Sequence, residues 1–136
     1  MRRYVNKFVI AGCGALAVLA FILWAAEDRV AHRAKLTLGA GISIAETERT
    51  VRERIRVIGG AAAYEEFAAA VETFPPAEQH TYAHAFGVAL FAEEDLKGVT
   101  VCDSRFSYGC YHEFLGRAIA AHGLGVVPEL NDGCAR

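Results

Sequence analysis

Histidine and cysteine side chains gather in the C-terminal part of this sequence. Four of the five histidines and three of the four cysteines lie after residue 79. His80 and His84 are four residues apart, a spacing that places two side chains on one face of a helix. Imidazole is a preferred ligand of several transition metals. His80, His84 and His112 are therefore candidate ligands of a transition metal or haem, with Glu113 or Cys110 as a further ligand or as a group that orients one.

Helix geometry excludes His122 from this predicted site. It follows His112 by ten residues, which is about 15 Å along a helix, whereas the ligands of one metal ion each lie about 2 Å from it. We expect His122 to interact with the C-terminal end of its helix, where a partly positive imidazole is favoured. Gly87 and Gly116 each follow a histidine by about one helical turn, and we expect both to leave room beside the cluster.

The same residues allow two other interpretations. In the first, the three histidines are buried side chains satisfied by hydrogen bonds, without a ligand. In the second, Cys110 or Glu113 serves a small enzyme, although a nucleophile pair of Cys110 and His112 would need an irregular backbone, because residues i and i+2 of a helix point about 200° apart. The zinc-protease motif H-E-x-x-H is absent, since residue 116 is glycine. We assign no catalytic residue, and binding is favoured over enzyme activity.

Cys102 and Cys110 are predicted to form a disulfide. Cysteines outside the cytoplasm tend to oxidise, and the seven residues between these two include a loop that can bring them together. A bridge between Cys110 and Cys134 is the competing pair, which the sequence alone does not exclude. Cys134 lies next to the end of the sequence, so either a disulfide tethers this tail or the chain is a piece of a longer protein.

An uncharged run of 19 residues, 8–26, predicts a membrane anchor. At about 1.5 Å per residue a helix of this length spans roughly 28 Å, close to the thickness of the hydrocarbon core. Residues 1–7 are basic, whereas Glu27 and Asp28 follow the run. The positive-inside rule then places the N-terminus in the cytoplasm. We expect a single-pass protein that contacts membrane lipid through residues 8–26 and carries residues 27–136 on the extracytoplasmic side.

Two other export signals fit this run less well. A cleaved secretory signal needs small residues at positions −3 and −1, but cleavage after Ala26 would put Trp24 at −3. A lipoprotein signal is suggested by the stretch that ends at Cys13, but only residues 8–12 would remain as its apolar segment. An uncleaved signal anchor is therefore the favoured interpretation, and all three alternatives place the domain outside the cytoplasm.

The composition is that of one small globular domain behind this anchor. The chain has 136 residues, 54% of them hydrophobic and 22% charged, which excludes disordered, collagen-like and rod-like coiled-coil proteins as well as a multi-domain enzyme. All 16 acidic residues but only 11 of the 14 basic residues follow residue 26, which gives this part a net charge of −5. Because nucleic-acid phosphates are also negative, we expect no nucleic-acid partner.

Helical signals occupy most of residues 43–136. Ser43 and Glu46 match a capping box, so a helix should follow, with its arginines and glutamates on a solvated face. Apolar spacing and helix-ending Gly and Pro residues predict the others. We expect an all-α fold, with an N-terminal transmembrane helix followed by a small bundle of about four short helices. The predicted elements are a polar helical stalk at 27–36, a linker at 37–42, helices at 44–58, 61–74, 77–95 and 109–122, a loop at 99–108, and one short turn at 128–130.

Two stretches resemble a recurrent pattern. Residues 80–87 read H-x-x-x-H-x-x-G, and residues 108–112 read Y-x-C-Y-H. Together they resemble membrane-anchored, Cys- and His-containing helical proteins of bacteria and archaea, a resemblance that covers about residues 76–123 and implies no established activity. In that pattern a cysteine precedes the first histidine and a glycine follows the second stretch, whereas this chain has Gln79 and Glu113 there.

These observations give two expectations for function. The first is a membrane-anchored, extracytoplasmic module that binds a transition metal or haem through the histidine cluster. The alternative is a purely structural or interaction domain of a membrane assembly, with a disulfide and buried histidines. The sequence names neither a ligand nor a protein partner.

Overall fold

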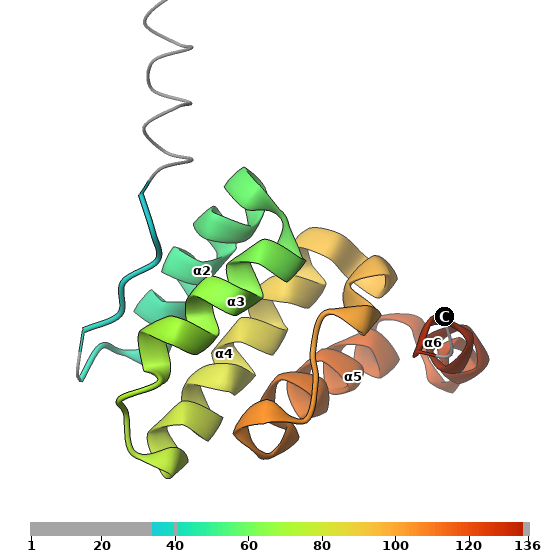
Figure 1. Ribbon diagram of the computed structural model, residues 1–136. Coiled ribbons are helices and arrows are strands. Elements are labelled where there is room, and N and C mark those ends of the chain that lie inside the picture. Colours follow the sequence, from blue (N-terminus) through green and yellow to red (C-terminus); the bar gives the residue numbers. More distant parts are fainter. Residues whose placement is uncertain (1–33, 40, 135–136) are drawn as a thin grey trace, which may run out of the picture. The chain divides into compact units, whose positions relative to one another are not determined.

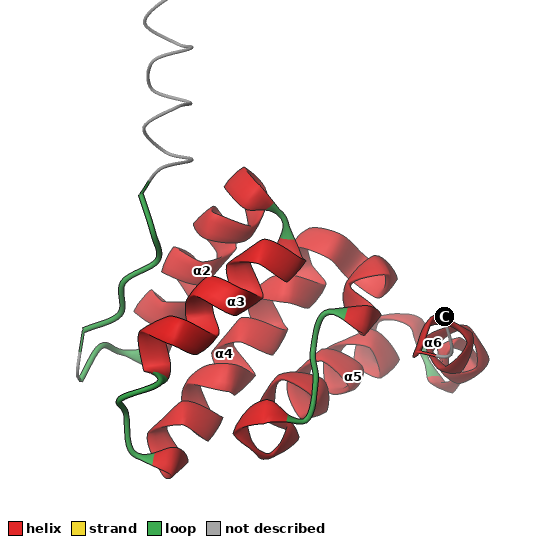
Figure 2. Cartoon of the chain, in the orientation of Figure 1, coloured by secondary structure: helices red, strands yellow, loops and turns green. Residues whose placement is uncertain are grey.

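The computed structural model describes residues 34–39 and 41–134. Within these residues every regular element is a helix or a helical turn, and none is a strand (Figure 2). The expected all-α class is therefore confirmed for this part of the chain. The five α-helices are α2 (Ile44–Ile58), α3 (Gly60–Val71), α4 (Pro76–Glu94), α5 (Gly109–His122) and α6 (Val127–Cys134), and the 3-10 turns are η1 (Asp95–Thr100), η2 (Arg105–Tyr108) and η3 (Leu124–Val126).

The predicted transmembrane helix at residues 8–26 lies outside the described residues. Among the helices that are described, none combines the length and the apolar character that crossing a bilayer requires.

Helix α4 is the centre of the bundle. Figure 1 shows α4 between α2 and α3 on one side and α5 on the other, and α4 packs most extensively against α2 and α5. Aromatic rings fill the space between the helices: the ring of Phe86 on α4 lies 5.1 Å from those of Tyr64 and Phe67 on α3, centroid to centroid. All three side chains are fully buried, and burial of each contributes about 1.5–3 kcal/mol to stability.

Two glycines allow α4 and α5 to approach closely. A Cβ atom at Gly87 would lie 2.5 Å from the carbonyl oxygen of Cys110, and one at Gly109 would lie 2.7 Å from the carbonyl oxygen of His80. Both positions therefore need glycine for the backbones to fit. Gly116 lies in open space, because a Cβ there would meet no described atom within 4 Å, so the approach of the two helices does not depend on it. The second glycine at that approach is Gly109, to which the sequence assigned no role.

The described end of the expected helical stalk, residues 34–36, is not helical, and the rest of that stalk, 27–33, lies outside the described residues. Residues 37–39 have no regular secondary structure, as expected for the linker, and both Leu36 and Leu38 are buried in the core. The backbone N–H of Leu36 donates to Oε2 of Glu66 at 2.9 Å. Alternate residues of an extended chain point to the same side, so an extended segment can bury both leucines against the bundle.

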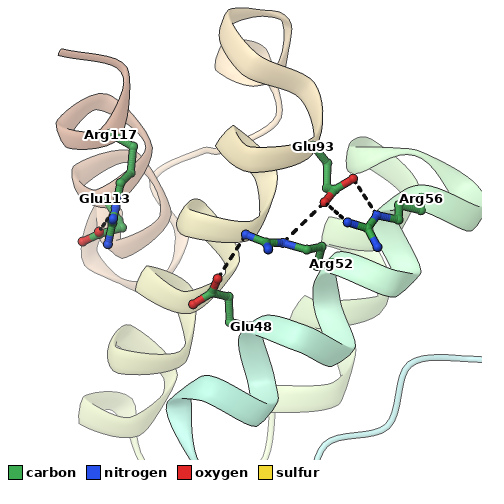
Figure 3. Close-up of polar contacts among 6 residues, drawn as sticks. All are labelled: Glu48, Arg52, Arg56, Glu93, Glu113 and Arg117. Atoms are coloured by element: carbon green, nitrogen blue, oxygen red, sulfur yellow. Dashed lines mark hydrogen bonds and ion pairs between the residues drawn. The ribbon is translucent and has the colours of Figure 1, made fainter. Parts of the chain in front are cut away.

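The sequence predicted that the arginines of α2 lie on a solvated face, but one of them does not. Arg54 is buried, and its Nε and Nη2 each donate to a carboxylate oxygen of Glu66 on α3 at 2.7 Å. The expectation holds better for Arg56, which pairs with Glu93 on α4 at the surface (Figure 3). Arg54 adjoins the buried Ile55 on the side of α2 that meets α3, so helical periodicity turns this one charge inward.

Helix α6 is longer than the single turn expected at 128–130. It packs on η1, where Leu130 is buried and a Cβ at Gly133 would lie 2.6 Å from Cγ1 of Val99. Pro128 is compatible with this helix because proline is tolerated in a first turn. Residues 131–133, Asn-Asp-Gly, favour a turn by themselves, but the packing of Leu130 against the rest of the domain keeps them helical.

Candidate metal centre

Three histidines converge between α4 and α5. His80 and His84 lie on α4, and His112 lies in the first turn of α5. One nitrogen from each ring lies within 4.8 Å of the other two, and no other such group of His, Cys, Asp or Glu side chains occurs among the described residues. Ligands of a tetrahedral zinc ion, each about 2.0–2.1 Å from the metal, lie about 3.3 Å apart. The structure thus brings together the three histidines that the sequence analysis selected, close to the spacing that one ion needs.

His80 is oriented by a backbone carbonyl. Its Nδ1 lies 2.7 Å from the carbonyl oxygen of Phe106. A carbonyl oxygen can only accept a hydrogen bond, so Nδ1 of His80 carries the hydrogen. In the neutral ring, Nε2 of His80 is then the nitrogen with the free lone pair.

His84 is oriented by a carboxylate. Its Nδ1 lies 3.3 Å from Oε2 of Glu113, whose other oxygen accepts from Nε of Arg117 at 2.7 Å (Figure 3). Burial alone would raise the pKa of Glu113, but the hydrogen bonds from Arg117 and His84 outweigh it and lower that pKa. An ionised carboxylate only accepts, so Nδ1 of His84 donates and its Nε2 also keeps a free lone pair.

Both rings are oriented so that their Nε2 atoms, each with a free lone pair, face each other. Nε2 of His80 and Nε2 of His84 are 3.0 Å apart. Two lone pairs at this distance repel unless a cation, either a proton or a metal ion, lies between them. Metal-binding histidines characteristically donate their second nitrogen to a carboxylate or a backbone carbonyl, and both rings do so here. Glu113, expected either as a further ligand or as a group that orients one, lies beside the cluster as the partner of His84 and not among the converging nitrogens.

His112 supplies the exposed side of the cluster. Its ring centroid is 6.0 Å from those of both His80 and His84 and 6.5 Å from that of the exposed Tyr108, on which it stacks. An exposed imidazole can rotate at little packing cost. The nitrogen of His112 already lies within 4.8 Å of a nitrogen of each of the other two rings, so an ion at the cluster is within reach of this ring.

A left-handed turn before α5 holds the partners of the cluster. Phe106, Ser107 and Tyr108 have φ angles of 55°, 52° and 63°, a conformation that costs a non-glycine residue roughly 1–2 kcal/mol. This turn, η2, takes the place of part of the loop expected at 99–108. It presents the Phe106 carbonyl to His80 and the Tyr108 ring to His112. Strained backbone of this kind is often kept where it positions functional groups.

A disulfide closes the segment that contains this turn. Cys102 and Cys110 are bonded, with their Cα atoms 5.6 Å apart, which is the pairing that the sequence favoured over Cys110 with Cys134. Both residues are buried. Because its sulfur is bonded, Cys110 is not a metal ligand in this structure, and it is not a free nucleophile either.

We expect the disulfide to contribute measurably to stability. A chain-entropy model for a loop of this size gives roughly 2–3 kcal/mol, so replacing both Cys102 and Cys110 with serine should lower the free energy of unfolding by about that amount. Denaturant titration of the oxidised protein and the variant measures the difference. Peptide mapping without reductant should recover the two cysteines in one linked peptide, and alkylation of both under these conditions would contradict the assignment.

An ion-pair network anchors the same segment to α3. Arg105 donates from Nε to Asp103 at 2.7 Å and from Nη2 to Glu65 at 2.6 Å, and the Tyr64 hydroxyl donates to Asp103 at 2.9 Å. Burial, together with the hydrogen bond to Asp103, raises the pKa of Tyr64 to about 12, so this hydroxyl keeps its proton at neutral pH. The sequence alone does not reveal this network, because its residues are scattered along the chain without a regular spacing.

His122 lies apart from the cluster, as expected from helix geometry. It occupies the last turn of α5, and its Nε2 is 2.8 Å from Oδ1 of Asp95. It thus has a partner of its own at the opposite end of the helix from His112.

Comparisons of the chain with protein-family models, with curated proteins and with solved structures gave no match. The chemistry of the histidine cluster must therefore be inferred from its geometry.

Proposed function

We propose that this protein is a metal-binding module in which His80, His84 and His112 bind one divalent transition-metal ion such as Zn²⁺. The observation that carries the proposal is the pair of Nε2 atoms 3.0 Å apart, each left with a lone pair by a hydrogen bond on the other side of its ring. A cation between these atoms removes their repulsion, and a third imidazole lies within reach of the same ion.

The geometry favours a bare metal ion over haem. A haem iron takes its protein ligands on the two opposite faces of the porphyrin, so two histidine ligands of one haem are held apart by the ring. Two nitrogens on opposite sides of one iron, each about 2 Å from it, are about 4 Å apart. Nε2 of His80 and Nε2 of His84 are 3.0 Å apart, and a third ligand nitrogen lies within 4.8 Å of both, which leaves no room for a porphyrin ring between them. Imidazole ligands suit zinc, copper, nickel and iron ions, and the proposal covers this class.

Binding of zinc to the metal-stripped protein tests the proposal. We expect one Zn²⁺ per chain in isothermal titration calorimetry. The melting temperature should also rise, because zinc at about 100 times its dissociation constant adds about 2.7 kcal/mol to the folded state. Mg²⁺ is the control, since it prefers oxygen ligands and should change neither measurement. Absence of zinc binding and of any shift in melting temperature would mean that a shared proton, not a metal, joins the two rings.

We also propose that residues 8–26 anchor the module in a membrane with its helical domain on the extracytoplasmic side. The uncharged run, the basic residues before it and the acidic residues after it support this topology. The disulfide supports the compartment, because such bonds persist where the environment is oxidising.

Reporter fusions test this topology. We expect a reporter that is active only outside the cytoplasm to be active when joined after residue 136, and a reporter that requires the cytoplasm to be inactive at the same place. The physical reason is the positive-inside bias of residues 1–7, which retains the N-terminus in the cytoplasm. The reverse pattern would contradict both the topology and the argument that the compartment favours the disulfide.

A further inference from the structure

We infer that the metal ion, once bound, keeps one coordination position for an exchangeable small anion from solution. The inference rests on the proposed function and adds the class of ligand that the site takes. It follows from three features of the cluster: the number of donors, their exposure and their charge.

Among the described residues, three side chains offer a ligand atom to the site. The converging group consists of His80, His84 and His112 alone. The sulfur of Cys110 is bonded to Cys102. The carboxylate of Glu113 faces Nδ1 of His84 rather than its metal-facing Nε2, and it is also held by Arg117. Zinc is almost always four-coordinate in structural sites, and sites with three protein ligands complete the shell with water or another external ligand.

The exposed side of the cluster gives such a ligand access. His112 is exposed, and 34% of the His84 side chain is accessible to solvent. Tyr108, which stacks on the ring of His112, is 53% exposed. A small ligand can therefore reach the ion from the side of α5 where these rings meet solvent, without opening the core of the bundle.

Charge decides the class of this ligand. Three neutral imidazoles leave the two positive charges of the ion uncompensated. The carboxylate beside the cluster, that of Glu113, is already paired with Arg117 at 2.7 Å, so much of its charge is balanced there. Anions such as hydroxide, carboxylates or azide are favoured at a site with this net charge, and a single free position admits one donor atom.

Cobalt substitution combined with azide tests the inference. Co²⁺ bound by imidazole nitrogens absorbs visible light, and the position and intensity of its bands follow the ligands around the ion. We expect the metal-stripped protein to develop such bands with one equivalent of Co²⁺, and azide to change them in a saturable way. Perchlorate at the same ionic strength, which coordinates metals poorly, should leave the bands unchanged.

The outcomes separate the inference from the proposed function. Cobalt bands that do not respond to azide would mean that the shell is already complete, which overturns the inference and leaves metal binding intact. If no visible bands develop with Co²⁺, the proposed function fails and the inference fails with it. An equal response to perchlorate would mean a general effect of salt and would also overturn the inference.

Discussion

Replacing His84 with alanine is expected to lower the affinity for Zn²⁺ at least about 100-fold. Loss of a partner that merely orients a ligand typically costs 10–100-fold in metal affinity, and His84 is itself one of the three converging donors. It also joins the cluster to Glu113. Competition with a chelator of known affinity measures the change for the wild type and the variant at the same pH.

His122→Ala is the matched control for this variant. His122 lies on α5 but outside the cluster, paired with Asp95, so its loss should leave zinc affinity within about twofold of the wild type. Circular dichroism and melting temperature in excess chelator show whether each variant folds without metal. A folded His84→Ala protein that binds zinc as tightly as the His122→Ala protein would exclude the proposed site.

The sequence indicated the three histidines of the candidate site and the carboxylate of Glu113 beside them, but not the backbone carbonyl that orients His80. The spacing of His80 and His84 fixes their common face once the helix is known. Their meeting with His112 depends on the close approach of α4 and α5 at Gly109, a tertiary contact that one sequence does not reveal. The Phe106 carbonyl is a backbone group in a left-handed turn, and nothing in the residue types of that turn favours this conformation.

Some helix ends are set by local sequence and could be predicted, whereas others depend on tertiary packing and could not. The bounds predicted for α2 and α5 agree with the structure, because local signals end both helices: Gly59 and Gly123 have φ angles of 82° and 75°, which glycine adopts without strain. Helix α6 was underestimated because it depends on the burial of Leu130. The sequence did not predict that the side chain of Arg54 is buried, because its partner, Glu66, lies on the next helix.

Replacing Arg54 with alanine is expected to lower the free energy of unfolding by about 2–3 kcal/mol at neutral pH. Breaking a fully buried ion pair costs about 3–5 kcal/mol, and here Arg54 is 9% exposed but Glu66 is 22% exposed, so the cost should be smaller. Arg56→Ala is the matched control: its side chain is 58% exposed, and surface pairs contribute about 0–1 kcal/mol. Chemical denaturation measures both variants.

The difference between Arg54→Ala and the wild type should depend on pH with a defined sign. The hydrogen bonds from Arg54 lower the pKa of Glu66 in the folded protein. A carboxyl whose folded pKa is lowered stabilises the fold above its unfolded pKa, about 4.3, and this contribution disappears as the pH falls through the folded pKa. The advantage of the wild type should therefore be constant between about pH 6 and 8 and shrink below about pH 4. Two results would contradict the stabilising role of the Arg54–Glu66 pair between α2 and α3. One is an equal loss of stability in the Arg54 and Arg56 variants. The other is a stability difference between the wild type and Arg54→Ala that grows as the pH falls.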